Sequence, residues 1–378
     1  MIKDKCFTDD WLEQFKKQKD HKRIDKIILE KMIYALHLLE RLKANGLDFV
    51  FKGGTSLVLL LKEVNRFSID IDIICNTERT DLEKVLDNII QSSNFKNWQL
   101  DEHRSYQPGV PKAHYKFSFD THQHGSGAIL LDVLLDEPIY PEQTEIPIHT
   151  KWIESEGETL VTVPTIDAIT GDKLTAFAPN TIGIPYFKGK DKQSFSMEIS
   201  KQLFDLSKLF EKITNIEMVA QSFMAFAEQE IKYRNDKLER KQTPIEVLQD
   251  TIDTCVVIAK RGGGSDDEKE KFAELQKGIK AFDSGFLMSG NFRNDDAVPA
   301  AARIAYLAAK ILVYNMSPIQ YFKGQDTKGL NIEDPEWNFL NKLKKQPDVS
   351  SFYYWYQTVQ LLTEKTSPQI DIEDDINN

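Results

Sequence analysis

The sequence predicts an α+β protein with a mixed sheet, of the α/β type, in residues 1–164 and a mainly α-helical domain in residues 165–378. In the first half, short apolar runs with a period of two alternate with segments of helical periodicity, which is typical of helices packed on a sheet. After Thr165 the apolar residues recur almost throughout at helical spacing. We place the domain boundary near residue 164, where this change of period coincides with Pro164.

Composition limits the class of protein without naming a function. A chain of 378 residues allows two or three domains, and its net charge of −11 argues against a protein that coats nucleic acid nonspecifically. A local group of Lys and Arg would still suffice to bind a nucleic-acid substrate. No apolar run approaches the ~20 residues of a membrane helix, and the first residues are too polar for a secretory signal. The cysteines show no metal-site spacing, so we expect free thiols in a reducing cytoplasm. Since no segment resembles a membrane helix, we also expect no membrane partner.

The first half is expected to contain helices at 9–45 and short elements around a pair of glycines. Residues 9–45 read as two helices that end before Gly46, and residues 80–91 read as a third. Gly53-Gly54 separates a short apolar strand from a short helix at 55–62. Period-two runs predict the remaining strands at 69–74, 98–102, 114–119, 128–135 and 160–163.

The second half is expected to consist of successive helices. Two of them are placed with proline at the first helical position, at Pro244 and Pro299. The predicted helices span 166–176, 195–212, 216–229, 244–259, 267–283, 299–314, 337–344 and 350–363.

Two carboxylates share one face of the predicted strand 69–74. Alternate side chains of a strand point the same way, so Ser68, Asp70 and Asp72 face away from the isoleucines between them. Carboxylates roughly 7 Å apart on one face repel each other. Three interpretations remain open: the face is exposed to solvent, it contacts cations of the protein, or it binds metal.

A third carboxylate, Asp132, interrupts the nearly continuous apolar run 127–135, which predicts a strand covered on both faces. An unpaired carboxylate is most unfavourable there. If this strand neighbours strand 69–74, Asp132 can join Asp70 and Asp72 in one acidic cluster. Such a cluster suits one or two Mg²⁺ ions, which prefer hard oxygen ligands and leave positions for phosphate.

The segment Lys52-Gly53-Gly54-Thr55-Ser56 follows a short strand and opens a helix. Glycines at a helix N-terminus let backbone N–H groups approach an anion. A glycine pair before a helix is commonly only a turn, so the position of this turn, one helix before the acidic strand, is what makes it a candidate phosphate site.

The combination of Lys-Gly-Gly-Thr-Ser-Leu57 with Arg66-Phe-Ser-Ile-Asp-Ile-Asp72 resembles the polymerase-β-like nucleotidyltransferase superfamily. It most resembles the AbiEii/AbiGii toxin family of type IV toxin–antitoxin and abortive-infection systems. Two further motifs of that family have counterparts in the helical half. Lys173 matches the family's lysine on a helix after the sheet. Lys201-Gln-Leu-Phe-Asp205-Leu206 matches Arg-Asp-x-x-Asp-Leu in part, with Lys201 and Gln202 in place of the Arg-Asp pair.

The resemblance implies a nucleotidyltransferase core and a reaction. An NTP would place its phosphates on Gly53, Gly54, Thr55 and Ser56, and Lys173 would neutralise triphosphate charge. Asp70, Asp72 and Asp132 would hold Mg²⁺ in a two-metal site that Mn²⁺ could also occupy, and Asp205 would be a further catalytic residue. The acceptor implied is RNA, tRNA in particular. The partner implied is a cognate antitoxin encoded nearby, and the biological role implied is phage defence.

Several alternatives stay open on the sequence alone. Lys52 and Arg66 could contact phosphate or shield the carboxylates, and Ser68 is expected to orient the aspartates. His122 and His124 are interpreted as part of a polar hairpin loop, not as a metal pair. Rival functions are transfer to a small molecule or a protein side chain, and a non-catalytic binding protein that keeps the fold.

Overall fold

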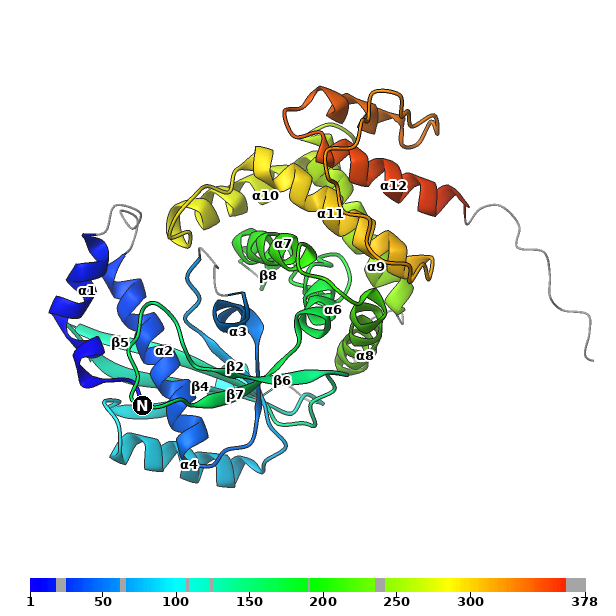
Figure 1. Cartoon of the computed structure of the whole chain (residues 1–378). Helices are drawn as coiled ribbons and strands as arrows, with labels where there is room; N and C mark the ends of the chain where they lie inside the picture. Colours follow the sequence, from blue (N-terminus) through cyan, green and yellow to red (C-terminus); the bar gives the residue numbers. More distant parts are fainter. Residues whose placement is uncertain are drawn as a thin grey trace, which may run out of the picture. The chain divides into compact units, whose positions relative to one another are not determined.

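The computed structural model describes residues 1–17, 25–61, 66–106, 109–122, 125–189, 191–234 and 242–364. Contacts divide the chain into two compact units (Figure 1). Unit 1 comprises Met1–Ile169 with Asp283–Asn291, and unit 2 comprises Thr170–Phe282 with Phe292–Asn378. The functional domains 1–164 and 165–378 remain a prediction.

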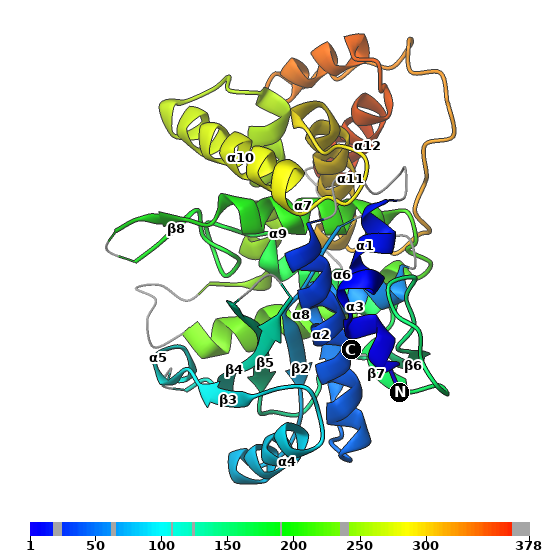
Figure 2. The same cartoon turned by 90° about the vertical axis from the view of Figure 1, so that its left-hand side faces the viewer.

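Unit 1 is built on a five-stranded mixed sheet in the order β1-β2-β5-β4-β3. β2 and β5 run parallel, and the other neighbouring pairs are antiparallel, which confirms the predicted mixed sheet. Figure 2 shows β2, β5 and β4 side by side. In chain order, the strands are β1 (Val50–Lys52), β2 (Ile71–Ile74), β3 (Asn97–Leu100), β4 (Lys112–Thr121) and β5 (Gly125–Leu134).

One face of this sheet is covered by α2 (Lys26–Ala44) and α4 (Arg79–Gln91). Tyr34 of α2 stacks on Phe119 with ring centroids 3.8 Å apart, and the Tyr115 hydroxyl donates to Glu83 of α4. Along β5, fully buried residues alternate with partly exposed ones. The prediction that this strand is covered on both faces was therefore wrong. Its open-face residues, although mostly apolar, are only half-buried, and Asp132 lies among them.

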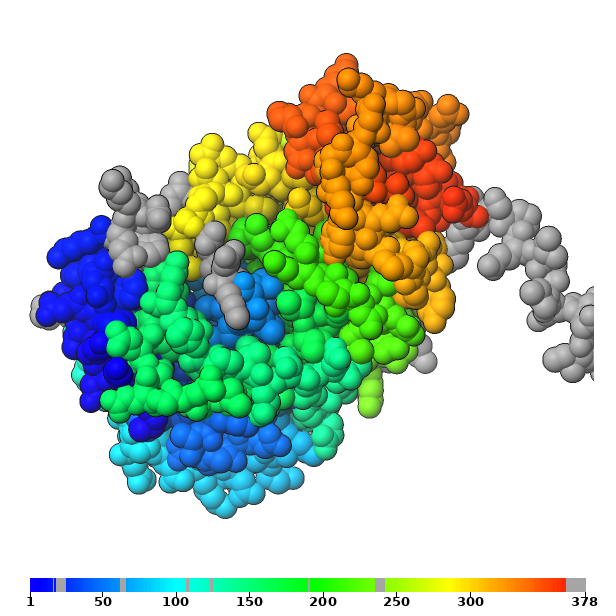
Figure 3. All heavy atoms as spheres, in the orientation of Figure 1, coloured from blue at the N-terminus to red at the C-terminus, as the bar shows by residue number. Residues whose placement is uncertain are grey.

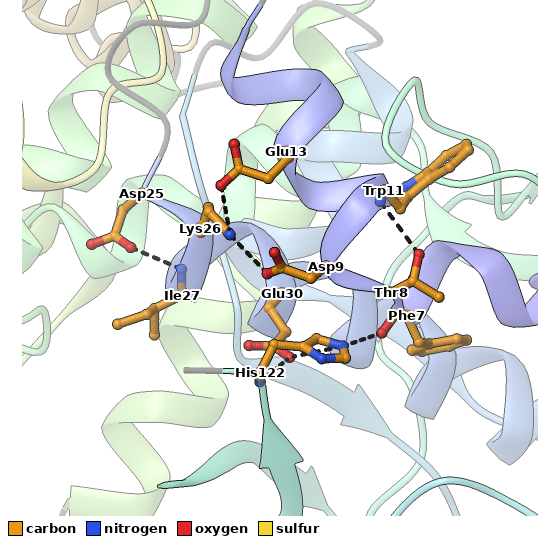
Figure 4. Close-up of polar contacts among 10 residues, drawn as sticks. All are labelled: Phe7, Thr8, Asp9, Trp11, Glu13, Asp25, Lys26, Ile27, Glu30 and His122. Carbon is orange, nitrogen blue, oxygen red and sulfur yellow. Dashed lines mark hydrogen bonds and ion pairs between the residues drawn. The ribbon is translucent and has the colours of Figure 1, made fainter. Parts of the chain in front are cut away.

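The N-terminal segment packs along the same unit. It contains a 3₁₀ helix, η1 (Asp4–Phe7), and the helix α1 (Asp9–Lys16). Ile2 forms an isolated bridge with Ser155. Figure 3 shows the dark-blue N-terminal segment against green segments of the chain. In Figure 4, the Lys26 ammonium lies between Asp9 and Glu13, 2.7 Å from each, which ties α1 to α2.

Some elements of unit 1 differ from those predicted. α3 (Gly53–Leu60) begins at the first glycine, and β2 begins at Ile71, so Asp70 precedes the strand. Residues 98–102 divide between β3 and a short helix, α5 (Glu102–Ser105). β6 (Gln143–Pro147), which pairs with β7 (Leu160–Pro164), was missed because it is short, polar and mostly exposed.

Unit 2 is mainly helical, as expected. α6 (Ile166–Ala176) starts in unit 1 and ends in unit 2, and a small hairpin of β8 (Phe187–Lys188) and β9 (Gln193–Ser194) follows it. The other helices are α7 (Ser196–Phe210), α8 (Ile216–Arg234), α9 (Pro244–Lys260), α10 (Asp266–Gly285), α11 (Asn294–Leu312), the 3₁₀ helix η3 (Asn338–Lys345) and α12 (Ser350–Glu364).

Two helix starts in unit 2 illustrate the rule for proline. α9 begins at Pro244 inside a capping box made by Thr243 and Glu246, as the sequence predicted. Pro299 instead lies inside α11, which begins at Asn294, because the Asp296 carboxylate accepts a hydrogen bond from the Arg293 backbone N–H at 2.8 Å and so caps the helix further upstream. Across the described residues, no helix is long and apolar enough to cross a membrane.

Candidate active site

Four polar side chains lie in one row across four strands of unit 1. Lys52 is paired with Asp72, Asp72 with Asp132, and Asp132 with His114. Directly opposed residues of neighbouring strands point to the same face of a sheet. The row therefore lies on the face away from α2 and α4, and all four residues are half-buried.

Asp132 is held by two side chains that can carry positive charge. His114 Nδ1 lies 2.6 Å from Asp132 Oδ1, and Arg104 Nη2 lies 3.2 Å from Oδ2. The carboxylate is about a quarter exposed, at 25%. Asp132 thus contacts one guanidinium group and one imidazole ring of the protein.

The first glycine of the turn makes room for Asp72. Gly53 has φ of +75°, and a Cβ atom there would lie 2.1 Å from Asp72 Oδ2. The Asp72 carboxylate is thus packed directly against the backbone of the turn. A side chain at position 53 would meet both a left-handed backbone and this carboxylate.

The second glycine makes room for Arg66 and Ser68. A Cβ atom at Gly54 would lie 2.7 Å from Arg66 Nη2 and 3.0 Å from Ser68 Oγ. The Arg66 guanidinium is buried, with the residue 2% exposed, and donates to the backbone oxygens of Phe67 and Gly54. Arg66 therefore braces the glycine turn from within the protein.

The two hydroxyls of the turn are also bound within the protein. Thr55 Oγ1 donates to Ser68 Oγ at 2.8 Å or to the Asp70 backbone oxygen at 2.5 Å, and Ser56 Oγ donates to the Gly53 oxygen at 2.9 Å. Thr55 and Ser56 are fully buried, whereas Asp70 is exposed. These contacts fix the turn to the segment that enters β2.

Lys173 and Asp205, predicted as separate motifs, lie together in unit 2. The Lys173 ammonium, on α6, is 2.9 Å from Asp205 Oδ2 on α7, and it donates to the Gln202 amide oxygen at 3.1 Å. Both residues are buried, with exposures of 5% and 1%. Gln202, which departs from the family pattern, thus supplies a second oxygen to the same ammonium group.

The sequence reasoning missed His114 and Arg104. His114 stood in a predicted strand, and a hairpin register would have placed it opposite Asp132, but no local pattern marks Arg104.

The two histidines of the predicted hairpin loop lie elsewhere in unit 1 or outside the described residues. The His122 backbone N–H donates to Glu30, and its ring contacts the Phe7 oxygen (Figure 4). His124 lies outside the described residues.

The donor atoms fit a divalent cation in chemistry, because Asp72 and Asp132 offer hard oxygens on adjacent strands. They do not form a complete protein cage. Within the part of the chain that the structure describes, no three His, Cys, Asp or Glu side chains are grouped so that they could hold a metal ion. Mg²⁺ commonly binds through one or two carboxylates together with substrate phosphates, which agrees with such an incomplete set.

Comparisons with known proteins identify the family. The model of the family described as nucleotidyl transferase AbiEii toxin, type IV TA system, matches residues 37–285. No curated protein matches. Among solved structures, a candidate nucleotidyltransferase from H. pylori is 15% identical, with a TM-score of 0.31, covering 66% of this chain and 95% of its own.

A second solved structure is an antigenic nucleotidyltransferase-like protein from Paracoccidioides brasiliensis. It is 13% identical with a TM-score of 0.35, and the match covers 55% of this chain and 89% of that one. The family match spans most of the chain, including the glycine turn, all three carboxylates, Lys173 and Asp205, so the chain belongs to the AbiEii family of nucleotidyltransferase toxins of type IV toxin–antitoxin systems.

Proposed function

We propose that this nucleotidyltransferase transfers NMP from an NTP to the hydroxyl of an RNA acceptor, with the 3′ end of tRNA as the first candidate. The bond between the α-phosphorus and the oxygen that links it to the β-phosphorus breaks, and pyrophosphate leaves with that oxygen. The acceptor oxygen forms the new bond to the α-phosphorus, and its hydroxyl proton is released to solvent. The observation that carries the proposal is the row Lys52–Asp72–Asp132–His114 beside the glycine turn.

The triphosphate would lie at the N-terminus of α3. Backbone N–H groups of Gly53, Gly54, Thr55 and Ser56 begin this helix, where the helix dipole favours anions. Since the Thr55 and Ser56 hydroxyls bind protein atoms, the phosphate contacts would come from the backbone. Lys52, next to the turn, adds positive charge, and Arg66 and Ser68 hold the turn in shape.

Asp70, Asp72 and Asp132 are the residues that would hold Mg²⁺, or Mn²⁺ in its place, together with the substrate phosphates, because in the described chain these carboxylates are not grouped as a protein cage. When bound, the metal supplies charge neutralisation at the phosphates and alignment of the reacting oxygens. His114 and Arg104 would orient the Asp132 carboxylate, as outer partners commonly do for ligating groups. Asp132 would accept the hydrogen bond of the acceptor hydroxyl at Oδ2, the oxygen that Arg104 contacts here.

Lys173 is proposed to neutralise triphosphate charge, with Asp205 and Gln202 fixing its ammonium group. The buried pair on α6 and α7 supports a fixed position for this lysine. The family supplies the expectation of a cognate antitoxin. A role in abortive infection and phage defence belongs to the same proposal.

A transfer assay tests this function and its rivals together. The protein is incubated with Mg²⁺, total RNA and each α-labelled NTP in turn, and the label is followed into RNA, protein and small molecules. Label in a tRNA-sized band that depends on Mg²⁺ is the expected result. Label in protein or in small molecules would show that one of these, and not RNA, is the acceptor. No transfer to any acceptor would favour a binding protein that keeps the fold.

A further inference from the structure

A pocket of about 610 Å³ lies within unit 2, apart from every residue named in the proposed function. Its walls come from α9, the start of α10, the loop after α6, and the segment that leads into η3. This volume lies in the range of pockets that bind small organic ligands.

The pocket is strongly acidic. Lys260 and Lys271 line it too, but each is already paired, Lys260 with Glu268 at 2.6 Å and Lys271 with Asp267 at 2.8 Å. The remaining carboxylates leave an excess of negative charge that would repel a phosphate or carboxylate ligand. The six acidic lining residues are Glu246, Asp250, Asp253, Asp267, Glu268 and Glu336.

Three of these carboxylates follow one stripe of α9, at positions 246, 250 and 253, where like charges destabilise a helix. Asp250 has a structural role, because it accepts hydrogen bonds from Asn180 and Thr181 and so anchors the turn after α6. Asp253 is exposed and accepts a hydrogen bond from the neighbouring Gln249 amide at 2.9 Å. This bond stays within α9, so it ties no other element to the helix, and the Asp253 carboxylate lines the pocket.

Aromatic side chains complete the walls: Tyr186, Trp337 and Phe339. Tyr186 is 7% exposed, and its hydroxyl, which lies near Thr254, makes no hydrogen bond of normal length and angle among the described residues. The Phe339 ring already attracts an ammonium group, since Lys260 Nζ lies 5.3 Å from its centroid. Carboxylates beside aromatic faces are the setting in which proteins bind organic cations.

We propose that this pocket binds an organic cation, an ammonium or guanidinium group on an alkyl chain. Asp253 takes the charged head, and Trp337 and Phe339 take the alkyl body. A free polyamine and an arginine side chain of a partner protein present the same chemistry. The proposal goes beyond nucleotidyl transfer and does not depend on it.

Isothermal titration calorimetry at 0.15 M salt tests the pocket with two probes, spermidine and N-acetyl-arginine amide. The wild type is expected to bind at least one probe saturably at one site. Asp253→Asn should weaken binding roughly tenfold, because a charged hydrogen bond is lost. Glu270→Gln, which removes a charge from an exposed position on α10 outside the pocket, should bind as the wild type does.

Circular dichroism confirms that each variant is folded before titration. Tighter binding of spermidine identifies a free polyamine as the ligand of the pocket. Tighter binding of the arginine derivative identifies an arginine side chain of a partner protein as the ligand. No saturable binding of either probe would overturn the proposal, as would equal weakening in Asp253→Asn and Glu270→Gln. Asp70→Ala should bind both probes unchanged, which separates this outcome from any failure of the transfer assay.

Discussion

At position 53 the backbone is left-handed and the Asp72 carboxylate leaves no room for a Cβ atom. Gly53→Ala should cost about 1–2 kcal/mol for the backbone alone and should also displace Asp72. We expect a lower midpoint of thermal unfolding together with loss of nucleotidyl transfer. Both are measurable on one preparation, by calorimetry and by pyrophosphate release.

Gly46→Ala is the matched control for this change. Gly46 has φ of +80°, but nothing lies within 4 Å of the added Cβ atom. This variant should lose similar stability and keep its transfer rate. Equal loss of activity in both variants would show that strain alone, and not the position of Asp72, lowers the rate.

His114 is expected to act by positioning Asp132. His114→Ala should lower the transfer rate roughly 10- to 100-fold and raise the Mg²⁺ concentration needed for half-maximal rate, as is usual when an outer partner of a ligand is removed. His114→Asn, whose amide can reach the same oxygen, should recover part of both losses. If His114→Ala needs the same Mg²⁺ concentration for half-maximal rate as the wild type, His114 does not position Asp132 for the metal.

Among these residues, the sequence predicted the ones marked by a local pattern. Asp70 and Asp72 stood out by their alternation, and Asp132 by its apolar neighbours. His114 needs the register of a hairpin: pairing Thr121 with Gly125 and counting outward on both strands places it opposite Asp132. Arg104 comes from a four-residue helix that no periodicity marks, and its contact is set by the tertiary fold.

At the scale of elements, the pair Lys173–Asp205 joins α6 to α7. Lys173→Met leaves a buried carboxylate without its cation, which should destabilise the protein by about 3–5 kcal/mol. The double variant Lys173→Met/Asp205→Asn should recover most of that loss, as urea unfolding would measure. If the pair serves catalysis, the double variant will be folded but inactive. If the double variant transfers nucleotide at the wild-type rate, the pair has only a structural role.

Long helices were predicted well and short strands less well. α6 matches its predicted bounds of Ile166–Ala176, although it is buried on nearly all sides and so has no single apolar face. β6 offers five mostly exposed residues, and α11 starts upstream of the proline expected to open it. In both cases pairing or capping partners decide the boundary, and these lie outside the local pattern.

At the scale of the whole molecule, the toxin family predicts a cost to the host cell. Induced expression of the wild type should slow growth, because the proposed transfer would modify RNA of the host cell. Asp72→Asn should not slow growth at the same protein level, as judged by immunoblot. Growth arrest by Asp72→Asn at equal abundance would point to a toxic effect separate from the row on the sheet.

The row beside the glycine turn is proposed to carry out the transfer, and the rate of pyrophosphate release measures this role most directly. Asp72→Asn and Asp81→Asn each remove one negative charge from unit 1, and Asp81 is an exposed residue of α4 that pairs with Lys84. With NTP, Mg²⁺ and RNA present, Asp81→Asn should release pyrophosphate at the wild-type rate. The rate of Asp72→Asn should be lower by at least about 100-fold, on the order of the loss when a key charge-stabilising group is removed. A wild-type rate in Asp72→Asn would contradict the account.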